Sequence, residues 1–272
     1  MSGPGERVRR FLNRPGTTDL SRYRRLLPEI GAREDDVREL PSAALRGLLT
    51  GSPEDAYAAL REAARRALGQ RPYDVQLLGA LVLRSGRVAE MATGEGKTLV
   101  GALAAAGYAA GGRSVHALSV NDYLARRDAD WMRPFYQLLG VTVSYIGQAS
   151  SRAERLAAYR ADVTYVPVSE LGFDVLRDRL RTEADGRVVP DPDVALIDEA
   201  DCVLIDEARV PMVLAGSADA GESGRDMAAI AHGLRPGRHY EVDLDGRNVS
   251  LTEAGARAAE QALGGIDLYS AG

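Results

Sequence analysis

The sequence predicts an α/β fold in which a parallel β-sheet is covered by helices on both faces. Apolar, β-branched segments alternate with helical segments between Arg87 and Gly216, as in repeated strand–helix–strand units. Two polar segments fall at the ends of predicted strands, a glycine-rich stretch at 91–98 and an acidic stretch at 198–201. Ligands of such sheets bind at the carboxyl ends of the strands, so both segments are candidates for one site.

The composition limits the classes of protein that the chain can belong to. Its 272 residues are 45% hydrophobic, enough for one or two domains with a buried core. A net charge of −5 argues against a dedicated nucleic-acid surface. The single cysteine, Cys202, excludes a disulfide framework, and the 3 histidines offer no metal cluster. The uncharged, Ala- and Gly-rich stretch 99–112 is shorter than the ~20 residues that span a bilayer, so any membrane contact is expected to be peripheral.

The first part of the chain, residues 1–51, is predicted to be a helical arm. It carries arginine clusters at Arg7, Arg9, Arg10, Arg22, Arg24 and Arg25. Such an arm could contact anionic lipid or an acidic partner, and the alternative is a solvated helix face. The sequence Ser52-Pro53-Glu54-Asp55 then predicts the start of a helix, and Gly69 predicts its end.

The expected elements of the central region follow from its periodicity. Strands are predicted at 87–91, 114–120, 141–146, 163–168, 194–198 and 211–215, and helices at 97–110, 121–139, 150–160 and 169–181. After a small, polar linker at 216–224, the alternation around Asp245-Gly246 predicts a hairpin. A short helix is predicted from Thr252 to Gly264-Gly265. The predicted division is an arm at 1–51, a nucleotide-binding domain at 52–216 and a small α+β tail at 217–272.

The glycine-rich stretch indicates a phosphate-binding loop. Gly94 and Gly96 allow the backbone to approach phosphates, and the helix that follows adds the favourable potential of its N-terminus. Lys97 would reach the β- and γ-phosphates, and the Thr98 hydroxyl would hold Mg²⁺. Lys97 is the only lysine among 34 basic residues, which indicates a site that needs an ammonium rather than a guanidinium. The alternative is a flexible turn that precedes a helix.

The acidic stretch supplies the second half of the predicted site. Asp198 follows an apolar strand and would hold Mg²⁺ opposite Thr98. Glu199 would orient or deprotonate the attacking water. Acids at a strand end are common, so the alternative for the acidic stretch alone is an exposed turn.

Several segments resemble the SecA preprotein translocase ATPase family, and they occur in that family's order. The segments are 71–79 (RPYDVQLLG), 91–99 (MATGEGKTL), 120–128 (VNDYLARRD), 172–178 (GFDVLRD) and 197–211 (IDEADCVLIDEARVP). The tail, with Leu268-Tyr269-Ser270, resembles the start of the family's preprotein-binding domain. The resemblance implies a RecA-like P-loop NTPase fold with ATP and Mg²⁺ as cofactors.

The resemblance also implies roles for individual residues. Gln76 would read the adenine edge, and Arg127 would lie near the nucleotide. The phosphates and the metal would be held by Gly94, Glu95, Gly96, Lys97 and Thr98, and the acid pair would be Asp198 and Glu199. From the residues alone, an exposed helical glutamine is the favoured interpretation of Gln76. For Arg127, a charged helix face is as good an interpretation as a place near the nucleotide. A further group, Asp206, Glu207 and Arg209, is expected to form a buried polar network.

Departures from the family pattern indicate which kind of family member the chain resembles. Ala92 and the segment 166–169 (VPVS) differ from the housekeeping protein, which suggests an accessory paralogue from a high-GC, actinobacterium-like genome. The family is longer, so the chain is expected to be a fragment with little turnover alone. Expected partners are preproteins, a SecYEG-type channel, an anionic membrane surface at the cytoplasmic face and a possible homodimer, with no nucleic acid. The alternatives are a DEAD-type nucleic-acid helicase domain and a non-catalytic binding module.

Overall fold

The computed structural model describes residues 19–180, 187–213, 230–242 and 249–263. The chain separates into two compact units, Met1–Leu214 and Ala215–Gly272, and each is described by itself. The domain boundaries expected from the sequence stay a prediction.

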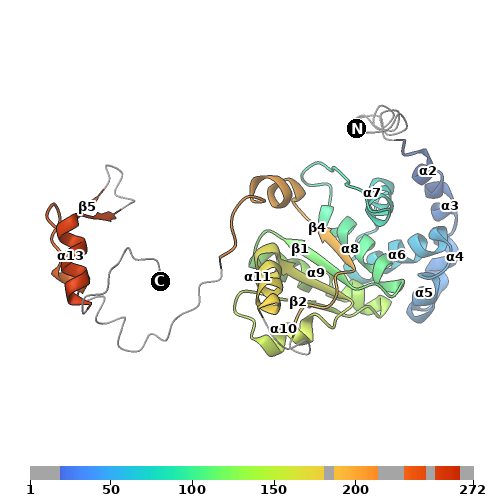
Figure 1. The fold of residues 1–272 in the computed structure, drawn as a ribbon. Coiled ribbons are helices and arrows are strands. Elements are labelled where there is room, and N and C mark those ends of the chain that lie inside the picture. The colour runs from blue at the N-terminus through green and yellow to red at the C-terminus, as the bar shows by residue number, and fades with distance from the viewer. Residues whose placement is uncertain (1–18, 181–186, 214–229, 243–248, 264–272) are drawn as a thin grey trace, which may run out of the picture. The chain divides into compact units, whose positions relative to one another are not determined.

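The larger unit is built around a parallel sheet of the strands β1 (Val115–Ser119), β2 (Val143–Tyr145), β3 (Val163–Pro167) and β4 (Val194–Ile197). Their order in space is β2-β3-β1-β4. Figure 1 labels β1, β2 and β4 of this sheet. The register sets Val115 of β1 beside Val163 of β3 and Val194 of β4. The carboxyl ends of β1, β3 and β4 therefore meet at one edge of the sheet.

Helices cover both faces of this sheet, which confirms the predicted fold class. On one face lie α8 (Lys97–Ala110) and α9 (Asp122–Leu139), packed against Val115 and Ala117 of β1. On the other face α10 (Arg152–Ala158) and α11 (Val168–Arg179) pack around Leu118 and Val166. Local chemistry sets the helix starts: the Asn121 side chain accepts a hydrogen bond from the Leu124 N–H at 2.9 Å, and a capping box opens α10.

The N-terminal helices pack onto the same core. They are α2 (Ser21–Arg24), α3 (Leu26–Ala32), α4 (Glu34–Glu39) and α5 (Ser42–Leu48). Three of them, α3 to α5, contact α6 (Pro53–Leu68), which contacts α9, and α7 (Asp74–Arg84) contacts α8. As predicted, the Ser52 side chain caps α6, and Gly69 ends it at a φ of 68°. Residues 19–51 thus share a hydrophobic core with the sheet through buried side chains such as Ile30 and Leu45.

The smaller unit contains an antiparallel pair, β5 (Tyr240–Val242) and β6 (Val249–Leu251), followed by α13 (Glu253–Ala262). Thr252 caps α13 by accepting a hydrogen bond from the Gly255 N–H at 3.1 Å. The predicted pairing and helix start are therefore confirmed. The turn residues Asp245-Gly246, the linker 216–224, the helix end at Gly264-Gly265 and the segment 268–270 lie outside the described residues.

Two predicted strands are wrong over the residues that the structure describes. Segment 87–91 is irregular, although Ala89 and Met91 pack partly against the core. Segment 211–213 is also irregular and exposed, and the rest of that predicted strand lies outside the described residues. A strand needs a hydrogen-bonded neighbour as well as β-forming residues, and β4 ends the sheet with a strand on one side only, within the described residues.

The expected buried network of Asp206, Glu207 and Arg209 is also wrong, because all three residues are exposed. A π-helical turn, Cys202–Asp206, carries the chain away from the end of β4. It leaves Leu204 and Ile205 exposed as well.

Candidate nucleotide site

The glycine-rich loop presents free backbone donors at the start of α8. Gly94 and Gly96 adopt φ values of 87° and 81°, a left-handed conformation that side chains disfavour. No side chain caps α8, and its first turn holds no acidic residue. The first N–H groups of a helix have no partner within the helix, and here they meet the positive end of its dipole. The arrangement suits a phosphate group.

Gln76 ties this loop to the start of α7. Its Nε2 donates to the Glu95 carbonyl oxygen at 2.9 Å, and its Oε1 accepts from the Tyr73 N–H at 2.9 Å. The side chain is 8% exposed, so the interpretation of Gln76 as an exposed helical residue is wrong. A Cβ on Gly96 would lie 2.5 Å from Nε2. A side chain at position 96 would therefore have to displace the Gln76 amide, in addition to adopting the left-handed backbone conformation.

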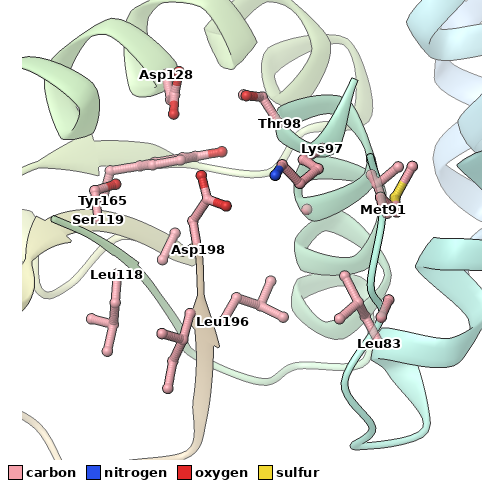
Figure 2. A pocket seen from close by; sticks show the side chains of 15 residues that line it. Leu83, Met91, Lys97, Thr98, Leu118, Ser119, Asp128, Tyr165, Leu196 and Asp198 are labelled. Atoms are coloured by element: carbon pink, nitrogen blue, oxygen red, sulfur yellow. The ribbon is translucent and has the colours of Figure 1, made fainter. Parts of the chain in front are cut away.

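A pocket at the carboxyl ends of the strands gathers three of the predicted residues. Lys97 and Thr98 line it from α8, and Asp198 lines it from the end of β4. Figure 2 shows their polar groups turned toward the same space, together with Asp128 of α9 and Tyr165 of β3. The remaining wall is mostly apolar, from Leu83, Ala89, Met91, Val100, Ala117, Leu118, Leu196 and Ile197.

Within the described part of the chain, the Lys97 ammonium has neither a hydrogen bond nor an ion pair. An unpaired cation that is half-buried in a pocket wall is suited to bind an anion. Asp198 accepts a hydrogen bond at Oδ1 from the Glu199 N–H at 3.0 Å, which leaves its other carboxylate oxygen for a ligand.

Glu199 occupies a strained position beside the pocket. Its φ is 50°, and it is the one described non-glycine residue with a positive φ. Such conformations cost about 1–3 kcal/mol and concentrate at functional sites. The side chain is exposed and does not line the pocket. The structure therefore places Glu199 next to the Lys97–Thr98–Asp198 group without bringing it into that group.

Another hollow lies next to Gln76. Its lining is Gly69, Gln70, Arg71, Tyr73, Gln76 and Leu99. The Tyr73 ring is 70% exposed there, and an exposed aromatic ring offers a flat surface for stacking. Sequence reasoning did not select Tyr73, although it precedes Gln76 in the 71–79 segment.

Two further residues of the main pocket were missed. Asp128 is buried, and burial raises the pKa of its carboxyl against the opposing effect of the Arg127 guanidinium. Tyr165 shares a 3.0 Å hydrogen bond between hydroxyl groups with Tyr136. Burial raises the pKa of both tyrosines, so both hydroxyls are neutral. Asp128 is the last residue of the 120–128 segment, so the resemblance could have identified it as a site residue. Tyr165 lies in an apolar strand, where nothing in the sequence pattern indicates a role in a site.

These features define a P-loop nucleotide-binding protein: a parallel sheet, an uncapped helix after a glycine loop, and an aspartate at a strand end. Residues 8–261 match the family model of the SecA DEAD-like domain. The chain belongs to the SecA family, and it is similar to that family's N-terminal ATPase motor domain. Membership of this ATPase family implies ATP binding.

The relatives agree with this assignment. The chain is 58% identical to protein translocase subunit SecA 2 of Thermobifida fusca, over 98% of this chain and 36% of the relative. It is 51% identical to protein translocase subunit SecA of Mycobacterium avium, also over 98% and 36%. A SecA 2 from Mycolicibacterium smegmatis is 56% identical over 77% of this chain and 27% of the relative.

The chain thus spans about a third of the length of these relatives. The resemblance to an actinobacterial SecA is confirmed. Among the described residues, no helix combines the length and the apolar character that crossing a bilayer requires.

Proposed function

We propose that this chain binds Mg·ATP at the pocket of Lys97, Thr98 and Asp198 and acts as the hydrolytic half of a translocation motor. The proposal is carried by one observation: an unpaired ammonium, a hydroxyl and a carboxylate share one pocket wall beside uncapped N–H groups. The loop residues Gly94, Glu95 and Gly96 would surround the phosphates. Thr98 and Asp198 offer oxygen ligands of the kind that Mg²⁺ prefers, so the residues fit that ion.

Base recognition would fall to Gln76. An amide has two N–H donors and a carbonyl with two lone pairs, and the protein uses one of each. One donor and one acceptor therefore remain. They match the adenine edge, where a glutamine can accept from N6 and donate to N7. Tyr73 would supply a stacking surface next to this edge.

Hydrolysis would depend on Glu199 as the base that orients or deprotonates the attacking water. When bound, Mg²⁺ would neutralise charge on the β- and γ-phosphates. Lys97 is the single cationic side chain among the described residues that line the pocket. An arginine that stabilises the transferring phosphoryl group is worth ~10³–10⁵ in rate. We therefore expect that the 272-residue chain binds ATP but turns it over slowly.

The activity of the whole protein is proposed from its relatives, which are named protein translocase subunits. ATP binding and hydrolysis would drive preproteins through a SecYEG-type channel in the cytoplasmic membrane. The protein would act at the cytoplasmic face, in peripheral contact with anionic lipid, and could form a homodimer. The exposed arginines among the described residues, such as Arg22 and Arg24, are compatible with such lipid contact.

The test is calorimetric titration of the purified chain with Mg·ATP, Mg·GTP and ATP in EDTA, together with steady-state phosphate release. We expect saturable ATP binding, weaker GTP binding and turnover far below 1 s⁻¹. Lys97→Arg should abolish binding, because a planar guanidinium cannot replace an ammonium among phosphates. Arg126→Lys, the reverse exchange at a 68% exposed side chain, is the matched control and should bind normally. Undiminished binding by Lys97→Arg would disprove the assignment of the loop.

A further inference from the structure

Asp128 is a buried acid in the pocket wall whose purpose the nucleotide site does not yet explain. It lies on α9, is 4% exposed and lines the same pocket as Lys97, Thr98 and Asp198. In Figure 2 its carboxylate points from α9 toward the space that Asp198 faces from below. A second negative group here would repel a polyphosphate, so its presence needs a compensating role.

Arg127 neutralises this carboxylate. Its Nε donates to Asp128 Oδ1 at 2.8 Å, and its Nη2 lies 2.7 Å from the same oxygen. A buried carboxylate without a partner is strongly unfavourable, so the pair holds the guanidinium against the pocket wall. The Arg127 side chain remains 43% exposed, and its guanidinium carbon lies 6.0 Å from the Tyr123 ring centre.

The pairing leaves most of the guanidinium free. Arginine has five N–H donors in a planar fork, and Asp128 engages two nitrogens through one oxygen. Among the described residues, Arg127 makes no other hydrogen bond or ion pair. The remaining N–H groups are held in one orientation beside the carboxylate of Asp128, which lines the pocket, so binding an anion there costs little additional side-chain entropy.

We propose that Asp128 is a positioning residue of the nucleotide site, which fixes Arg127 so that its free N–H groups bind the polyphosphate. The proposal rests on the proposed function. It also predicts the sign of a mutational effect. If Asp128 acted only through its charge, its neutralisation would strengthen ATP binding, whereas a positioning role predicts weaker binding.

The test compares Asp128→Asn, Arg127→Ala and the double variant by calorimetry with Mg·ATP and by thermal unfolding. The asparagine keeps the shape of the side chain but cannot hold the guanidinium as an ion pair. Hydrogen bonds to charged groups contribute about 1.5–3 kcal/mol, or roughly tenfold to a hundredfold in Kd. We expect at least tenfold weaker binding for Arg127→Ala and roughly threefold to tenfold for Asp128→Asn. The double variant should be no weaker than Arg127→Ala, because Asp128 acts through Arg127.

The matched control is the exposed pair on the same helix, in which the Arg126 Nε lies 3.8 Å from Asp130. Arg126→Ala and Asp130→Asn should leave ATP affinity within twofold of the wild type. Fully additive effects of the two site variants would overturn the proposal, and so would a lower melting temperature of Asp128→Asn with unchanged affinity. If Asp128→Asn does not fold, unchanged binding by Arg127→Ala still refutes it. A wild-type chain that binds no ATP refutes the proposed function itself, whereas normal binding by both site variants refutes only the positioning role.

Discussion

Replacing Gly96 by alanine tests the contact between the phosphate loop and Gln76. The substitution has two costs. The first is the left-handed backbone, at a φ of 81°, which costs a side chain about 1–2 kcal/mol. The second is the approach of the new Cβ to 2.5 Å from Gln76 Nε2. Gln76 must then move, and its hydrogen bonds to Tyr73 and Glu95 are worth about 0.5–1.5 kcal/mol each.

Gly94 provides the matched control, because it shares the strain but has no close neighbour. Its φ is 87°, and a Cβ there would meet nothing within 4 Å. We therefore expect Gly94→Ala to lose about 1–2 kcal/mol of unfolding free energy. Gly96→Ala should lose about 1–3 kcal/mol more, the combined worth of the two Gln76 hydrogen bonds.

The assay is urea unfolding followed by tryptophan fluorescence. Trp131 is the only tryptophan of the chain and lies on α9 in the larger unit, so its signal reports on the unit that contains the loop. The midpoint should fall in the order wild type, Gly94→Ala, Gly96→Ala at an unchanged m-value. Equal losses for the two alanine variants would show that Gln76 gives way freely and would refute the steric reasoning.

The remaining predictions concern Glu199 and His116. Glu199→Gln should retain Mg·ATP affinity and lose hydrolysis, whereas Glu199→Gly should also relieve the positive φ and raise stability by about 1 kcal/mol. Calorimetry measures the affinity, phosphate release measures the hydrolysis, and urea unfolding measures the stability. Equal losses of affinity and turnover in Glu199→Gln would show that Glu199 has a structural role. Burial lowers the pKa of His116, so the unfolded chain binds more protons there, and stability falls as the pH drops below about 6.5. His116→Phe should flatten the decline of the urea midpoint between pH 7 and pH 5, and an unchanged slope would contradict this linkage.

Local chemistry was sufficient to predict the helix starts and the fold class. Asn121 and Ser52 cap their helices by contacts three residues along the chain, and such contacts are visible in the sequence. The loop at 94–98 and the acid at 198 were found because each follows a predictable element. The experiments above test the predicted roles of these residues.

Longer-range contacts explain what the sequence did not show. The Gln76 side chain donates a hydrogen bond to the carbonyl oxygen of Glu95, 19 residues further along the chain. No local sequence pattern predicts that contact. In the sequence, Asp128 looks like one charged residue of an exposed helix face. In the folded chain, tertiary packing places it in the wall of the pocket. The segment 87–91 has the residues of a strand yet no strand partner among the described residues. In each case the deciding neighbour is distant in sequence.

Strand β4 lies at the edge of the described sheet and also leads into Asp198 of the candidate site. Within the described residues this strand pairs with β1 alone, and its other edge carries backbone groups that a further strand could engage. Ile197 ends the strand and Asp198 follows it. A segment that docks along this edge would therefore bear on the backbone that holds the acid. The same strand thus borders the described sheet and supports Asp198, a proposed metal ligand. Pairing of a further segment with β4 would therefore affect metal binding, and metal binding would affect that pairing.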